Sequence, residues 1–409
     1  MKIILLWMVS FLSLFLSIFW VLVIYTKKKE KSSIDTNLPG ISILVPALNE
    51  EKTIAKTLNS LLSSNYPNLE VIVINDQSTD STPLIVSKFT KKFRNVKLLH
   101  NIHKGIGKAS ALNLGLKHAS GKILGVVDSD SEISKDALLN MMPYFQDTQT
   151  AAVISAIKVK DPNNLYQGIQ RIEYILATFS RTLMSKVDAL HVTPGALSLY
   201  RASLIKELNG FDENNLTEDL EIAMRLKYHG YNIKIAPNAL SYTNVPSTFK
   251  SLWNQRVRWF RGFIYNTSKY RKMFLSRQHG IMGRFQIPIN FITLAAILLS
   301  SSIIIYEILR NIYLFALRMA ALNWDVSSLY YRFTSTKELI LNVNTNIFFP
   351  AATTFLLSLY ILNKAHKSSG ERWILSPALI VYFTIYPIIR MLHWLAAFYK
   401  EAVKSKRKW

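Results

Sequence analysis

The sequence predicts an α/β domain with a mostly parallel, doubly wound sheet, inserted between transmembrane helices. Long apolar runs lie near both ends of the 409-residue chain, whereas positions 27 to about 284 have the mixed composition of a globular domain. Within this middle part, short strand-like runs alternate with segments of helical spacing. That alternation is typical of parallel strands joined by helices.

The first apolar run, Ile3 to Tyr25, has 23 residues and no charge. It is long enough to cross a hydrocarbon core of about 30 Å. The basic stretch KKKEK follows at 27–31. The positive-inside rule therefore predicts a membrane anchor at residues 1–26, with its N-terminus outside and the next domain in the cytosol.

The predicted soluble domain, residues 27–242, opens with strand-like runs rich in Ile and Val, of which EVIVIN is typical of a buried strand. After the first run, Ile54, Leu58 and Leu61 recur at helical spacing. The predicted order is a β-rich run from 41 that stops at Pro46, helix 51–62, strand 70–75, a helix ending at 93, strand 95–100, helix 108–118 and strand 122–127.

Carboxylates stand where two of these strands end. Asp76 ends the second, and Asp128 and Asp130 end the fourth. Ligands of such sheets bind beyond the carboxyl ends of the strands, and residues i and i+2 of extended backbone point to one side. Asp-Ser-Asp can also be turn chemistry. The apolar run ILGVV before it and the equivalent place of Asp76 favour a site for Mg²⁺ or Mn²⁺.

Each of two later segments admits both a purely structural and a functional interpretation. HKGIGKAS at 103–110 lacks the spacing of a P-loop, but a helix N-terminus with Lys104 and Lys108 can hold an anion. The helix predicted within 215–230 begins with Thr217, Glu218 and Asp219, which suit capping and the helix dipole as well as catalysis.

The stretch NQRVRWFRG, 254–262, combines arginines and a tryptophan shortly before an apolar run. It fits either a basic interfacial helix on lipid head groups or a substrate clamp. In a helix over 247–266, Trp253, Val257 and Phe260 share one face, and the arginines lie largely off it. We expect residues 243–284 to form interfacial amphipathic helices.

Residues 285–409 contain further membrane candidates: 287–309, 347–362 and 374–398. The last carries Pro387 and Arg390, which predicts a kink or a side facing protein. The segment 311–331 is apolar but contains Arg318 and Asp325, and both a span and an interfacial position stay open. A cytosolic basic tail requires an odd number of membrane crossings. Five crossings result if the segment 311–331 also spans, and three result if one of the other candidates is re-entrant, whereas four would violate the rule.

Composition excludes several function classes. The 49 Lys+Arg against 26 Asp+Glu give a net charge of +23, but no nucleic-acid motif accompanies it, so we expect no nucleic acid among the partners. Many cations flank apolar runs, which indicates a membrane surface and phosphate-bearing ligands. Without cysteine, disulfides, thiol nucleophiles and Cys-based metal sites are impossible.

Taken together, four motifs resemble the D, DxD, TED and QxxRW series of glycosyltransferase family 2. They are Asp76 in NDQSTD, DSD at 128–130, TED at 217–219 and QRVRW at 255–259. From about Ile41 to Gly262 the chain is similar to the processive membrane synthases of cellulose, chitin, hyaluronan and poly-N-acetylglucosamine. The resemblance implies a glycosyltransferase-A-like, Rossmann-like domain and hexosyltransferase activity.

On the donor side, the resemblance implies that Asp76 contacts the nucleotide, with Lys108 assisting. Asp130 would ligate Mg²⁺ or Mn²⁺ on the diphosphate, and Asp128 beside it would share the metal and the nucleotide-sugar. Two positions depart from the family pattern, since Gln77 stands where glycine is usual and Gly105 where asparagine is usual. Uridine is the expected base.

On the acceptor side, the resemblance implies that Asp219 is the general base, with Glu218 beside it as the second catalytic carboxylate. Gln255, Arg258 and Trp259 would close the site, with Arg258 on the pyrophosphate and Trp259 stacked on the acceptor sugar. The helix N-terminus lowers the pKa of Asp219 and neighbouring carboxylates raise it, and the sequence leaves that balance open. A single displacement with inversion is expected.

The function we expect is transfer of a sugar, N-acetylglucosamine by preference, from a UDP-sugar to a growing polysaccharide that is extruded through the membrane. The alternative is a single transfer onto a membrane lipid, as in ceramide glucosyltransferase. A nucleotide-sugar sensor or scaffold is the non-enzymatic alternative. We expect a multi-pass protein of the cell membrane with a cytosolic catalytic domain, lipid and a carbohydrate or lipid acceptor as partners, and room for an accessory subunit.

Overall fold

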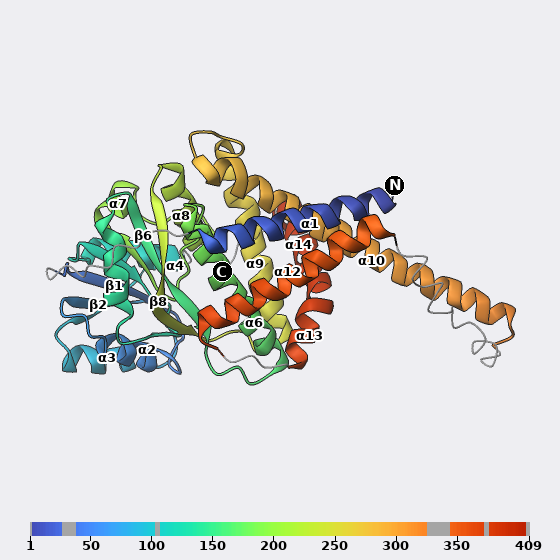
Figure 1. The fold of residues 1–409 in the computed structure, drawn as a ribbon. Coiled ribbons are helices and arrows are strands. Elements are labelled where there is room, and N and C mark those ends of the chain that lie inside the picture. The colour runs from blue at the N-terminus through green and yellow to red at the C-terminus, as the bar shows by residue number, and fades with distance from the viewer. Residues whose placement is uncertain (1, 27–37, 103–106, 325–343, 372–375, 406–409) are drawn as a thin grey trace. The chain divides into compact units, whose positions relative to one another are not determined.

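The computed structural model describes residues 2–26, 38–102, 107–324, 344–371 and 376–405 (Figure 1). The chain divides into two compact units. One unit comprises Met1–Thr26, Ile289–Arg372 and Thr384–Met391. The other comprises Lys27–Pro288, Trp373–Phe383 and Leu392–Trp409, and it contains the sheet and the candidate site.

The sheet of the described chain has eight strands in the order β3-β2-β1-β4-β7-β6-β8-β5. The strands that the sequence predicted are parallel neighbours: β1 (Ile41–Ala47), β2 (Leu69–Asn75), β3 (Val96–His100) and β4 (Ile123–Val126). The remaining strands are β5 (Ser131–Ile133), β6 (Thr150–Val159), β7 (Ser198–Arg201) and β8 (Asn232–Thr243). β7 pairs antiparallel with β4 and β6, and β5 with β8, whereas β6 and β8 are parallel. The predicted α/β fold is confirmed, with a mixed second half.

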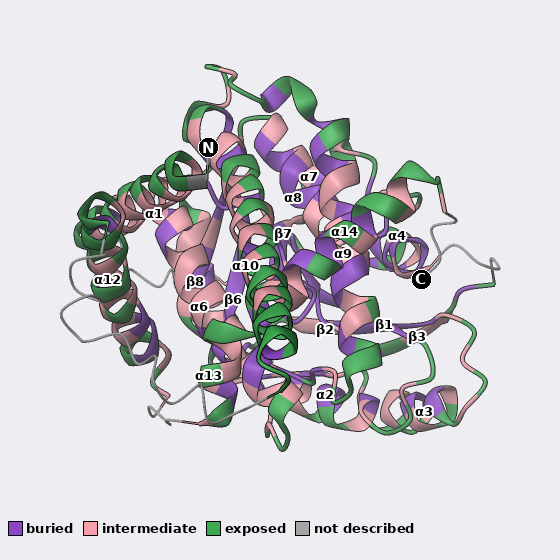
Figure 2. Cartoon of the chain, turned by 90° about the vertical axis from the view of Figure 1, so that its right-hand side faces the viewer, coloured by how far each residue is buried: buried purple, intermediate pink, exposed green. Residues whose placement is uncertain are grey.

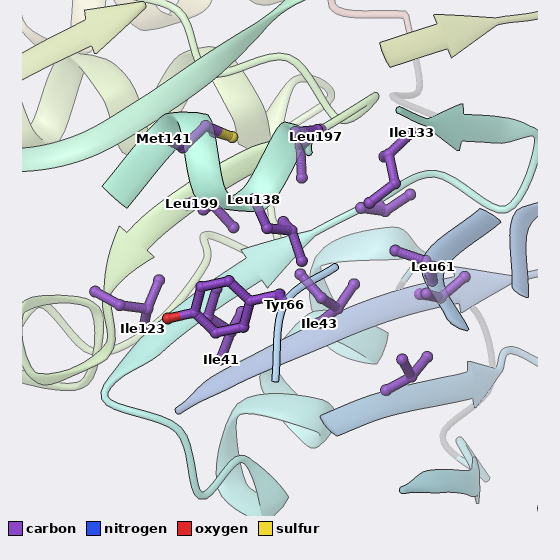
Figure 3. Packing of buried hydrophobic residues seen from close by; sticks show 14 of the residues in the cluster. Ile41, Ile43, Leu61, Tyr66, Ile123, Ile133, Leu138, Met141, Leu197 and Leu199 are labelled. Carbon is purple, nitrogen blue, oxygen red and sulfur yellow. The ribbon is translucent and has the colours of Figure 1, made fainter. Parts of the chain in front are cut away.

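Helices cover both faces of the sheet. Side chains of a strand point alternately to opposite sides, so the apolar strands present apolar side chains on both faces, and each face needs a covering layer. Ile41 and Ile43 of β1 pack on one face with residues of α2 (Ile54–Leu62), α3 (Thr82–Lys92) and α5 (Ala137–Met141). Leu44 packs on the other face with α4 (Lys108–His118), α7 (Ala202–Glu207) and α8 (Glu218–Tyr228). Figure 3 shows the first of these clusters, and Figure 2 shows central strands in the colour of buried residues.

Two helix boundaries illustrate how local chemistry sets the elements. α4 begins and ends where the sequence predicts. The helix expected from Glu51 begins later, at Ile54, because the preceding residues form a turn. The carbonyl of Glu50 accepts from the Thr53 amide at 3.1 Å, and the Glu51 carboxylate accepts from the Ser81 amide at 3.1 Å. The domain also contains α6 (Leu165–Lys186) and α9 (Phe249–Lys269).

Among the residues that the structure describes, three helical segments are long and apolar enough to cross a membrane, namely Ile3–Tyr25, Met282–Ala321 and Thr345–Ser369. The first is α1 (Lys2–Tyr25), and the last is α12 (Thr345–Ser369), which packs against α1. A fourth candidate is the pair α13 (Pro377–Thr384) and α14 (Tyr386–Ala402), which is bent by 52°. The break just before Pro387 confirms the predicted kink, since proline disrupts the preceding helical turn.

The segment whose placement stayed open, 311–331, is no separate helix as far as the structure describes it. It continues α10 (Ile287–Ala321), which follows a π-helical turn at Met282–Gln286. No proline or glycine interrupts the sequence between Pro288 and Ala321, so nothing ends the helix there. The remainder of the segment, with Asp325, lies outside the described residues.

Candidate active site

A cavity of about 600 Å³ lies at the carboxyl ends of the parallel strands, within the unit that holds the sheet. Every site residue that the sequence predicted lines this cavity. They are Asp76, Lys108, Asp128, Asp130, Glu218, Asp219, Gln255, Arg258 and Trp259. Residues up to 183 positions apart in the chain are thus brought to one place, as expected for ligand sites of α/β sheets.

Asp76 follows β2 directly and is fixed from two sides. Its amide donates to the carbonyl of Ala47 at 2.8 Å, and the Asn101 side-chain amide donates to its carboxylate at 2.8 Å. Burial raises the pKa of Asp76, and the hydrogen bond from Asn101 opposes that shift. The strand end therefore presents a partly desolvated acceptor of hydrogen bonds to the cavity.

One departure from the family pattern, Gln77, lies in the turn after Asp76. Gln77 has a φ of +63°, the left-handed conformation that glycine adopts freely. A side chain there costs about 1–2 kcal/mol. The turn therefore keeps the backbone shape for which glycine is suited, although the residue differs. The other departure, Gly105, lies outside the described residues, as does Lys104.

Lys108 is held among carboxylates at the start of α4. Its Nζ lies 2.6 Å from Asp128 Oδ1 and 2.9 Å from Glu218 Oε1. Burial alone would lower the pKa of Lys108, but Asp128, Glu218 and Asp219 outweigh burial and raise it. Lys108 therefore stays charged and connects the strand-end carboxylates to the first turn of α8.

Gly195 makes room for this ion pair. Its carbonyl accepts from the Asp128 amide at 2.8 Å. A Cβ at Gly195 would lie 2.5 Å from both carboxylate oxygens of Asp128 and 2.6 Å from Lys108 Nζ, closer than real Cβ contacts. A side chain at this position would therefore force the Asp128 carboxylate and the Lys108 ammonium group to move.

Asp130 and Asp128 form the part of the site best suited to a metal. Burial, together with the charges of Asp128 and Glu50, raises the pKa of Asp130 to about 7. Clustered carboxylates that repel one another in this way fit a hard divalent cation, which would relieve the repulsion. The described residues contain no group of three or more His, Cys, Asp or Glu side chains able to hold a metal ion. The remaining ligands would come from phosphate and water.

Asp219 stands in the first turn of α8 with its carboxylate accepting from the Leu220 amide at 2.8 Å. Burial and then Glu218 raise its pKa to about 6, against the lowering effects of Lys108, the Leu220 amide and Arg258. Of the two effects that the sequence left in balance, the one that raises the pKa of Asp219 prevails, with burial as the larger contribution. A carboxyl group with this pKa is ionised at neutral pH and is more basic than an ordinary aspartate.

Thr217 occupies the N-cap position of α8, but its side chain makes no capping hydrogen bond to the helix. Its hydroxyl instead accepts from the Asn266 side chain of α9 at 3.0 Å. Gly262 of α9 lies directly against Thr217, and a methyl group at Gly262 would overlap the threonine side chain. The expected capping role is thus replaced by close packing between α8 and α9.

Two arginines of α9 are buried and paired with glutamates of other helices. Arg256 is 1% exposed and binds Glu173 of α6 at 2.6 Å. Arg261 is 6% exposed and binds Glu401 of α14 at 2.7 Å. Neither guanidinium faces lipid head groups, so that interpretation is wrong for these two residues. Buried arginines need such paired carboxylates because an unpaired buried charge is too costly.

The apolar face of α9 packs on the end of α14 that belongs to the same unit. The ring of Trp253 lies 4.6 Å from that of His393, and Phe260 stacks on Trp394 at 4.1 Å with an interplanar angle of 4°. The face that the sequence suggested for a membrane surface is therefore covered in part by protein. Phe260, Phe263 and Trp394 also line the cavity, next to Trp259.

Sequence reasoning missed several lining residues: Glu50, Tyr174, Arg181, Gly195 and Trp394. Tyr174 and Arg181 are seven residues apart on α6, which places them on one helix face. That spacing could have indicated a shared position in the site. However, polar residues on one face of a helix more often face solvent, so the spacing alone does not predict a ligand site. Gly195 follows a proline in VTPGALS, a pattern that predicts only a turn.

Comparison with known proteins places this fold and site in a family. The model of the family described as Glycosyl transferase family 2 matches residues 42–208. A Bacillus subtilis protein named "Probable glycosyltransferase YdaM" is 31% identical over 300 residues, which cover 70% of this chain and 71% of that protein. The chain belongs to glycosyl transferase family 2. This family 2 glycosyltransferase is also 34% identical over 265 residues to the poly-β-1,6-N-acetyl-D-glucosamine synthase of Staphylococcus epidermidis.

That second match covers 62% of this glycosyltransferase and 64% of the length of the synthase. Among solved structures, the mannosyltransferase PcManGT from Pyrobaculum calidifontis, in complex with GDP-Man and Mn²⁺, is similar over 97% of this chain and 96% of that chain. The TM-score is 0.62 and the sequence identity 20%. This likeness confirms the glycosyltransferase-A-like fold.

Proposed function

We propose that this glycosyltransferase transfers N-acetylglucosamine from UDP-N-acetylglucosamine to a hydroxyl of a growing polysaccharide. The observation that carries the proposal is the gathering of strand-end aspartates, a perturbed aspartate and the Gln255–Trp259 segment in one cavity. The sugar is chosen because of the similarity to a poly-β-1,6-N-acetyl-D-glucosamine synthase. Uridine is chosen because the motif series of this chain resembles enzymes that use UDP-sugars.

At the donor end, Asp76 would hydrogen-bond the nucleotide, and Asp128 and Asp130 would hold Mg²⁺ or Mn²⁺. When bound, the metal would neutralise charge on the diphosphate. Lys108 is already engaged with Asp128 and Glu218, so its role would be to orient these carboxylates as well as to face the donor. Arg258 would contact the pyrophosphate, where a guanidinium stabilises the negative charge that grows on the leaving group.

At the acceptor end, Asp219 would take the proton of the attacking hydroxyl. The hydroxyl oxygen then forms a bond to the anomeric carbon as the bond from that carbon to the UDP oxygen breaks. Burial and Glu218 support this role because they raise the pKa of Asp219 to about 6, so the group is ionised at pH 7 yet basic enough to accept a proton. One displacement of this kind inverts the anomeric configuration.

We infer that the enzyme is a multi-pass protein of the cell membrane with a cytosolic catalytic domain, and that its polymer leaves through the membrane helices. Three helices long and apolar enough to span support the membrane location. The basic stretch after α1 supports a cytosolic domain. With the bent pair α13–α14 re-entrant, the three spans of the described part of the chain satisfy the odd number that a cytosolic tail requires.

The test uses the full chain, purified into lipid nanodiscs with Mn²⁺ and a panel of UDP-sugars, with UDP release and product size followed together. Release of UDP from UDP-N-acetylglucosamine with a long, polydisperse product would support the proposal. A product of one sugar on a lipid would establish the alternative, single transfer to a membrane lipid. Binding of UDP-sugar without release of UDP would indicate a sensor.

A further inference from the structure

One face of the Trp259 indole is covered by a buried cation. The guanidinium carbon of Arg256 lies 4.1 Å from the ring centroid. This is a cation–π distance, and the two residues are one helical turn apart, so they share a face of α9. Trp259 also lines the cavity. The indole therefore has one side occupied by Arg256 while its ring borders the site.

Arg256 is itself fixed by two hydrogen bonds. Its Nη2 donates to Glu173 Oε2 at 2.6 Å, and its Nη1 donates to Gln255 Oε1 at 2.9 Å. The side chain of Arg256 is 1% exposed, whereas that of Glu173 is 19% exposed. The planar guanidinium is therefore held in one orientation, because a rotation that broke these hydrogen bonds would leave a buried charge unpaired. The ring that stacks on that plane is restrained with it.

We propose that Arg256 is a positioning residue that presents the other face of Trp259 to a neutral pyranose ring of the acceptor. The inference rests on the proposed function, since it takes Trp259 as the acceptor contact. Sugar rings place C–H groups against the electron-rich face of an aromatic ring. Glu173 of α6 completes the arrangement by holding Arg256, so α6 helps to set acceptor geometry although it carries none of the family motifs.

The same helix offers a matched control. Arg261 is also a buried arginine, with Nε donating to Glu401 at 2.7 Å and Nη2 donating to the Ser405 carbonyl at 2.7 Å. It stands two residues after Trp259, and residues at that spacing do not face each other on a helix. Loss of either guanidinium removes an ion pair with a glutamate, but only loss of Arg256 uncovers the indole.

The experiment compares Arg256→Met, Arg256→Lys, Glu173→Gln and Arg261→Met in the full chain in nanodiscs. Each variant is assayed for transfer to an oligosaccharide of N-acetylglucosamine and for hydrolysis of UDP-N-acetylglucosamine without acceptor. Fluorine NMR of 5-fluorotryptophan-labelled protein reports the position of Trp259, whose signal among the eight tryptophans is assigned with Trp259→Phe. Thermal unfolding is measured alongside.

We expect Arg256→Met to lower kcat/KM for the acceptor about 10- to 100-fold, mainly through KM, because small misplacements of positioning groups have effects of that size. Hydrolysis should change little, and the Trp259 signal should shift. Arg256→Lys keeps a charge for Glu173 but not the flat stacking surface, so it should recover the Tm more than the transfer. The kcat/KM of Glu173→Gln for the acceptor should lie between the values of Arg256→Met and Arg256→Lys. Arg261→Met should lower the Tm without changing the ratio of transfer to hydrolysis.

Equal effects of Arg256→Met and Arg261→Met on that ratio, or an unchanged Trp259 signal in Arg256→Met, would overturn the positioning role while leaving the proposed function intact. Absence of any sugar transfer by the wild-type chain is a different result. It would overturn the proposed function, and the acceptor role of Trp259 and Arg256 with it.

Discussion

Substituting Gly195 by alanine tests whether the Lys108–Asp128 ion pair is part of the catalytic geometry. The added Cβ would lie 2.5 Å from both Asp128 oxygens and 2.6 Å from Lys108 Nζ, whereas ordinary contact begins at 3.4 Å. Restoring that contact requires a movement of about 0.9 Å, the difference between 3.4 and 2.5 Å. Misplacement of a positioning group by about 1 Å costs about 100-fold in rate. We therefore expect kcat/KM for the proposed donor, UDP-N-acetylglucosamine, to fall about 100-fold.

The assay is UDP release in nanodiscs, with thermal unfolding in parallel. Overpacking typically costs about 1–3 kcal/mol, so the Tm should also fall. Gly40→Ala is the matched control, because a Cβ at Gly40 meets only the Cα of Gly121, at 3.7 Å, an ordinary contact. It should leave activity unchanged. If Gly195→Ala keeps its activity within about threefold of the wild type, the placement of Asp128 does not limit catalysis and the reasoning is wrong.

Four further results are expected. Asp219→Asn should reduce transfer about 100-fold or more while UDP binding is retained, and equal loss of both would exclude its role as base. The rate should rise with pH through about 6, because Asp219 must lose its proton and its raised pKa lies there, so a flat profile across that range would contradict the assignment. EDTA should stop turnover, and undiminished activity would exclude the metal role of Asp130. Trp259→Ala should reduce acceptor use more than donor hydrolysis, and equal reductions would remove the stacking role.

Much of the donor half of the domain could be predicted because its signals are local. The β-branched run that became β2 and the segment that became α4 carry their own periodicity, and the observed bounds agree within a residue. The strand-end position of Asp76, Asp128 and Asp130 then followed from the rule for parallel sheets. Antiparallel β7 was not predicted, because its four residues pair with strands far away in sequence.

The surroundings of α9 could not be predicted, since they depend on partners distant in the chain. Helical spacing suggested that Arg256 and Arg261 lie off the buried face, yet both are buried. Their partners Glu173 and Glu401 are 83 and 140 residues away in sequence. The pKa of Asp219 likewise depended on how deeply α8 is buried, which no local pattern encodes.

The close approach of Gly262 to Thr217 packs α9 tightly against α8, and such packing resists sliding of one helix along the other. On the proposed roles, the base on α8 and the acceptor-stacking ring on α9 then belong to one rigid piece. The spacing between the attacking hydroxyl and the sugar that anchors the chain would be the same in every round of addition. Opening for donor entry and UDP release would have to occur elsewhere in the domain, so a growing polymer could stay in register while the donor site empties and refills.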